Sequence, residues 1–198
     1  MLFQQTAILT SALINTANDT QPGSSFTSPT GGQIYAGLIG QTVQLSEAMA
    51  QNYSSVLHGG VYMYGQFLTG SSALNAKGQI VFYDTLAHAK SRIWTPDPPT
   101  ALTQIAGVTL NAVTAGNFGF IQIAGLATVL CKATVTDTTL GDIGFVVSDS
   151  SLGKVDANTP GSATAAQQAV KIGKFYEAPA NAGLKLLEIQ PPLFGLCY

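Results

Sequence analysis

The stretch IAGVTLNAVTAGNFGFIQIAGLATV, residues 105–129, is the part of the chain that most directly predicts the fold. Apolar and polar side chains alternate through residues 105–113, which is the period of a half-buried strand. Ala-Gly-Asn at 115–117 is typical of a turn. Residues 118–129 then form a long strand candidate, with a bend expected at Gly125. The stretch therefore predicts two consecutive β-strands joined by a turn.

The same strand patterning recurs on both sides of this stretch. Further strands are expected at residues 61–67, 79–83, 143–147, 169–177 and 183–190. Turn-forming residues at 148–154 and the proline-rich TPDPPT at 95–100 are expected to be loops. The spacing leaves no room for crossover helices after residue 60, which disfavours a parallel sheet. The predicted fold class is mainly β, a small antiparallel β-barrel or sandwich.

One short helix is expected, at residues 45–57. Ser46 could cap it, and Glu47 would lie in its first turn, where the helix dipole favours an anion. Gly59 and Gly60 would end it. Its apolar residues then share one face: Leu45, Met49, Tyr53 and Val56.

Residues 1–42 are expected to form an extended arm. Turn and loop residues dominate the segment QPGSSFTSPTGG at 21–32. Such a segment has too few apolar residues for a core of its own. Phe26, Ile34 and Tyr35 are large enough to anchor in a partner and are the candidate assembly contacts, although a functionless tail is the alternative. The predicted organisation is an arm with a short helix over 1–60 and a β domain over 61–198.

Charged residues make up only 9% of the chain, well below the roughly 25% of ordinary domains. A surface so poor in charge suits a protein packed against copies or partners, and an uncharged extracellular β domain is the plainer alternative. The net charge is −2 with a single arginine, Arg92, so direct nucleic-acid binding is not expected. No apolar run reaches the ~20 residues of a membrane helix, so membrane association is not expected either. The first residues, 1–19, lack the basic start of a signal peptide.

No catalytic constellation is evident in the sequence. The two histidines, His58 and His88, have no Gly-x-Ser-x-Gly elbow to serve, and His88 lies in LAHAKSR, which we interpret as a loop. Asp137 and Asp142 flank a TTLG segment and could hold a cation, but they lack the dense acid spacing of a calcium loop. No phosphate-binding glycine loop occurs. The sequence predicts no enzyme activity, no cofactor and no metal site.

The two cysteines, Cys131 and Cys197, are too far from any histidine in the sequence to suggest a zinc site. Two buried free thiols are the default interpretation, and a disulfide between them stays open.

From Lys77 onward the strand order resembles that of the capsid cement or head-decoration proteins of tailed phages. The segments that carry the resemblance are KGQIVFYD, IAGVTLNAVTAGNFGFIQIAGLATV, LGDIGFVVSDSSLGKV, VKIGKFYEA and LKLLEIQPP. The matching positions are Gly78, Gly107, Gly116, Gly125, Gly141, Asp142, Gly173, Glu177 and Ala178. The resemblance covers about 120 of the 198 residues, and the first 60 residues and TPDPPT depart from it.

The resemblance implies a virion protein, made in the host cytoplasm, that binds the outside of an assembled head. Its partners would be the major capsid protein and further copies of itself, commonly as trimers. One alternative is a phage tail or adhesin-like protein that binds a receptor glycan, which a groove lined by Trp94 and tyrosines would support. A β-fold hydrolase with a dispersed site is another, which a buried histidine or carboxylate pair in a pocket would support.

Overall fold

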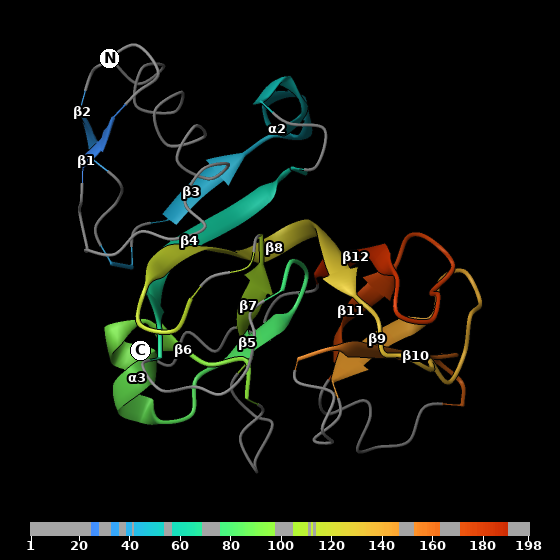
Figure 1. Cartoon of the computed structure of the whole chain (residues 1–198). Helices are drawn as coiled ribbons and strands as arrows, with labels where there is room; N and C mark the ends of the chain where they lie inside the picture. Colours follow the sequence, from blue (N-terminus) through green and yellow to red (C-terminus); the bar gives the residue numbers. More distant parts are fainter. Residues whose placement is uncertain are drawn as a thin grey trace.

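The long strand expected at residues 118–129 is present as β8 (Phe118–Leu130), and the other strands of its sheet are arranged around it (Figure 1). The computed structural model describes residues 25–27, 33–35, 39–40, 42–53, 57–68, 76–97, 105–110, 112, 114–146, 153–162 and 171–189. Within these residues the fold is mainly β, as expected: ten strands form one sheet and two form a separate pair. Several predicted features fall wholly or partly outside the described residues: residues 1–24, the helix position Val56, most of the turn at 148–154, the prolines at 98–99 and 191–192, and Cys197.

The first half of β8 belongs to a closed ring of five strands. It pairs with β4 (Gly60–Phe67) and, near its bend, with β7 (Ile105–Thr109). The ring continues from β7 to β5 (Ile80–Phe82), and from β4 to β6 (Ile93–Trp94). It closes where Phe82 and Thr95 exchange two backbone hydrogen bonds of 2.8 and 2.9 Å. A small barrel is therefore formed by β4, β5, β6, β7 and the first half of β8.

The second half of β8 belongs to another ring. It pairs with β12 (Leu184–Ile189), which is followed by β11 (Lys171–Phe175), β9 (Ile143–Val146) and β10 (Val155–Asn158). A bridge between Val155 and Cys131, the residue that follows β8, closes this ring. The expected barrel is thus present as two small closed rings, which share β8 and lie side by side in Figure 1.

The join between the rings is the irregularity that was expected at Gly125. Val61 pairs with Ala124 but Tyr62 pairs with Gln122, so Ile123 is an extra residue on β8. Gly125 has a φ of +92°, a conformation that side chains disfavour. This bulge lets one strand turn from the first ring into the second.

Three groups of buried side chains form the core. The largest fills the second ring and the face of β5 and β7 next to it, and includes Phe82, Phe175 and Leu187. A second group lies within the first ring around Phe67 and Trp94, whose rings meet edge to face at 5.3 Å. A third joins β3 (Thr42–Leu45) and α2 (Glu47–Tyr53) to the outside of β4 and β8. Strand β5 sends Ile80 and Phe82 to one core and Val81 to another.

The predicted helix is shorter than expected and begins later. Leu45 lies in β3, where it pairs with Gly60, and the helix α2 runs from Glu47 to Tyr53. Leu45 is 2% exposed, because from β3 its side chain packs into the third group of buried residues. The main sheet therefore begins before residue 61. Further towards the N-terminus, β1 (Ser25–Thr27) and β2 (Gln33–Tyr35) form an antiparallel pair, where an extended arm was expected.

Two predictions for the region after residue 60 are wrong. The segment LAHAKSR contains a second helix, α3 (Leu86–Ser91), where a loop was expected; Thr85 caps it by accepting a hydrogen bond of 3.1 Å from the His88 N–H. This helix connects β5 to β6, although no crossover helix was expected after residue 60. Strand β6 pairs parallel to β4 over two residues, and the other named strand pairs of the sheet are antiparallel, as expected. Because α3 has only six residues and none of them is buried, its sequence shows no apolar periodicity that would identify it as a helix. Strand β10 was also missed, because VDAN is short and follows turn residues.

Candidate functional site

The three candidate assembly contacts lie on the β1–β2 pair. Phe26 is opposite Ile34 in the register, and Tyr35 is opposite Ser25. Within the described residues this pair belongs to a different sheet from the two rings. The structure therefore brings the three positions together on one hairpin. An isolated two-stranded hairpin is marginally stable in water, so this element gains most from a further surface to pack against.

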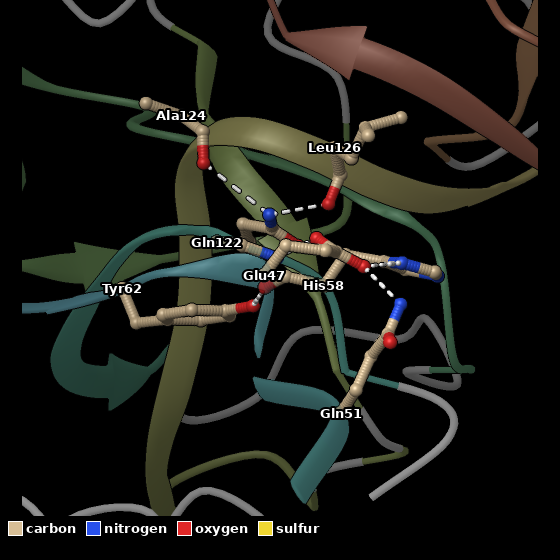
Figure 2. A network of polar contacts seen from close by, with 8 residues as sticks. Glu47, Gln51, His58, Tyr62, Gln122, Ala124 and Leu126 are labelled. Atoms are coloured by element: carbon tan, nitrogen blue, oxygen red, sulfur yellow. Dashed lines mark hydrogen bonds and ion pairs between the residues drawn. The ribbon is translucent and has the colours of Figure 1, made fainter. Parts of the chain in front are cut away.

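Glu47 and His58 form a polar cluster where α2 meets β4 (Figure 2). Glu47 Oε1 accepts a hydrogen bond of 2.9 Å from Gln51 Nε2 and lies 3.1 Å from His58 Nδ1. Glu47 Oε2 accepts from the Gly59 N–H. That backbone donor, followed by His58 and Gln51, holds the pKa of Glu47 below its usual value. The cluster fastens the first turn of the helix to the chain that enters β4.

Neighbouring side chains extend this fastening to the bulge of β8 (Figure 2). The Tyr62 hydroxyl donates to the His58 carbonyl, and burial raises the pKa of Tyr62. Gln122 Nε2 donates to the carbonyls of Ala124 at 3.2 Å and Leu126 at 2.6 Å. These side chains hydrogen-bond to backbone carbonyls before β4 and around the bulge of β8, which is a structural role. That His58 and His88 support no turnover stays a prediction.

His88 has a carboxylate neighbour as well. Its Nδ1 lies against Asp84 Oδ1, four residues earlier, at the start of the exposed helix α3. The pair lies beside the Thr85 cap, so it is part of the N-terminal capping region of α3.

Asp137 and Asp142 serve the loop between β8 and β9. Asp137 Oδ1 accepts from the Thr138 and Thr139 N–H groups at 2.7 and 3.1 Å, and Oδ2 accepts from the Thr159 hydroxyl. These bonds lower the pKa of Asp137 to about 2. Asp142 accepts from the Thr139 N–H at 2.9 Å, and burial raises its pKa. Among the described side chains, no group of three His, Cys, Asp or Glu residues is arranged to hold a metal ion.

Trp94 lies inside the first ring with none of its surface exposed. Its indole packs edge-on against Phe67, and its Nε1 has no hydrogen-bond partner within the described residues. A sugar cannot stack on a ring in that position, so Trp94 does not form the groove that a glycan-binding protein would need.

The outward face of β8, β12 and β11 is unusually apolar. Along β12, Leu187 and Ile189 point into the second ring, so Leu184, Leu186 and Glu188 point outward. Along β8, Ala127 and Val129 point inward, so Leu126, Thr128 and Leu130 point outward. On β11, Phe175 is buried and Lys174 is exposed, and Tyr176, which directly follows the strand, is exposed as well. We call these eight outward residues the outer face: Leu126, Thr128, Leu130, Lys174, Tyr176, Leu184, Leu186 and Glu188.

The strand register orders the outer face into three rows. Leu130 is opposite Leu184, Thr128 is opposite Leu186, and Leu126 is opposite Glu188. Tyr176 joins the middle row, because its N–H donates to the Leu186 carbonyl at 2.9 Å, and Lys174 joins the last row opposite Glu188. Tyr176 and Leu184 are 60% and 44% exposed, which is more than a packed side chain shows. A surface of this kind on a soluble domain usually marks a contact with another protein.

Sequence reasoning missed the outer face. A signal was present, because GLATVL at 125–130 and LKLLEI at 184–189 are apolar at both odd and even positions. A strand exposed to water on one side should alternate, so apolar residues at both parities indicate that both faces are covered.

Several glycines that carry the phage resemblance are required by the backbone. Gly78, Gly116, Gly125 and Gly141 have φ angles between +79° and +92°. The resemblance thus describes turns and bends of the two rings. Comparison with protein families found no family model that matches the chain, and a search of curated proteins found no significant relative. No helix in the described part of the chain has the length and apolar character needed to cross a membrane.

Proposed function

We propose that this chain is an accessory protein of a tailed-phage head, a cement or decoration protein. It binds the outside of the shell formed by the major capsid protein and associates with copies of itself. The virion head is its site of action. The one observation that best supports this role is the outer face, whose exposed Leu184 and Tyr176 gain free energy when another protein covers them.

The two attachment regions have different tasks in this proposal. The hairpin with Phe26, Ile34 and Tyr35 contacts the shell, and the outer face contacts other copies. Hairpins add to the edge of another sheet through main-chain hydrogen bonds, which suits a partner that is itself repeated. Repetition over a symmetric shell multiplies weak individual contacts.

Co-sedimentation of the purified full chain with phage heads that lack an accessory protein tests the proposal. We expect saturable binding at a fixed copy number per head. A matched variant, Phe26→Ala/Ile34→Ala, should bind less, whereas Leu86→Ala on the exposed face of α3 should bind as the parent does. Absence of the chain from sedimented heads, combined with binding to isolated tails or to a glycan, would contradict the proposal and support the tail or adhesin alternative.

A further inference from the structure

The outer face carries a pair of opposite charges that lie beside each other. Lys174 on β11 and Glu188 on β12 are directly opposite in the register. Both are exposed, and among the described residues neither forms an ion pair. By contrast, the nearby Lys185 has a partner, because its Nζ lies 3.7 Å from Glu177 Oε2. The outer face therefore presents one positive and one negative group side by side, and the described residues supply no ion pair to either of them.

We propose that the outer face binds the same face of a second copy about a two-fold axis. An axis parallel to β11 and β12, above the outer face and midway between the two strands, places Lys174 of each copy over Glu188 of the other. The same rotation places Tyr176 of each copy over Leu186 of the other, because these two residues are also neighbours across the strands. One operation thus pairs both charges and covers the most exposed aromatic side chain of the face.

Self-complementarity selects a second copy over an unrelated partner. An isologous contact needs a surface in which each group finds its complement after a two-fold rotation, and adjacent Lys and Glu satisfy this condition. A face of one sign would repel its own copy. The low charge of the chain, 9% of residues, leaves little other repulsion to overcome. Aligned packing of two sheet faces is a common way to bury such surfaces.

The inference specifies the self-association part of the proposed function, and it differs from the trimer that the phage resemblance implies. It predicts that the isolated full chain is a dimer, of twice the 20.5 kDa monomer mass. Analytical ultracentrifugation of the full chain up to about 0.1 mM measures this mass and the dissociation constant.

Charge reversal tests the pairing. Lys174→Glu and Glu188→Lys should each raise the dissociation constant by about tenfold or more, because each places like charges together twice per dimer. The doubly reversed variant should regain the parent affinity, and an equimolar mixture of the two single variants should form mixed dimers. Lys90→Glu on α3 is the control; it makes the same change of net charge as Lys174→Glu, away from the outer face, and should leave the dissociation constant unchanged. Unchanged circular dichroism and melting temperature exclude misfolding of these exposed-site variants.

Four results would overturn the inference: a monomer throughout this range, a trimer, a dimer that neither reversal weakens, or a Lys90→Glu variant that weakens it equally. A monomer that still binds phage heads would also assign the outer face to the shell, and would leave the proposed function in place.

Discussion

Gly125 is the position where the account of the fold can be tested most sharply. Its φ of +92° would cost an alanine ~1–2 kcal/mol, because a Cβ is strained in this region. That Cβ would also lie 2.6 Å from Gly60 Cα and closer still to the Gly59 carbonyl oxygen, so two backbones would have to separate. Such overpacking typically costs a further 1–3 kcal/mol, or about 2–5 kcal/mol in total. We expect Gly125→Ala to lower the melting temperature by roughly 5–15 °C.

Urea unfolding followed by tryptophan fluorescence and circular dichroism measures this loss of stability. Gly161→Ala is the matched control, because no atom of the described residues lies within 4 Å of its added Cβ and its φ is not positive. It should change the free energy of unfolding by less than about 1 kcal/mol. If Gly125→Ala is as stable as Gly161→Ala, β8 does not pass from one ring to the other at a close glycine contact, and the reasoning is refuted.

Three further predictions concern the arm, the Glu47 cluster and the histidines. Deletion of residues 1–38, which leaves β3 intact, should hardly change the melting temperature, whereas the number of copies bound per head should fall. If the truncated chain still binds heads at the full copy number, the arm has no role in attachment. If the truncated chain fails to fold, the arm belongs to the core. Because the pKa of Glu47 is lowered in the folded protein, its carboxylate stabilises the fold above the unfolded-state pKa, and this contribution is lost as the pH falls through the folded-state pKa. In thermal scans, Glu47→Gln should therefore be less stable than the parent at pH 6–7, and the difference should vanish at acid pH. His58→Ala and His88→Ala should leave any measured turnover unchanged in the folded protein, and a selective loss in either variant would restore the enzyme hypothesis.

The strands could be predicted because burial within a strand produces a local pattern of apolar residues in the sequence. The mostly apolar run at residues 118–129, which follows the Ala-Gly-Asn turn, identified β8, and the glycine at 125 marked its bend, because only a special backbone conformation makes a mid-strand glycine useful. Closure of the two rings produces no such local pattern. It depends on Thr95 meeting Phe82 and Val155 meeting Cys131, contacts between distant residues that no local pattern encodes.

The same reason explains which parts of the candidate site could be predicted. Phe26, Ile34 and Tyr35 stand out as large apolar residues among turn residues, so composition alone selects them. The outer face depends on which residues of β8, β11 and β12 share a side, and the bulge at Ile172 changes that parity within β11. The opposition of Lys174 and Glu188 likewise follows from register and cannot be read from either strand alone.

Cryo-electron microscopy of heads produced in cells that carry the gene for this chain tests the central claim most directly. The account predicts density for the two-ring fold on the outer surface of the shell, with the β1–β2 hairpin against the capsid protein and the outer face covered by another copy. Heads without this density, or density for the chain only on the tail, would contradict it.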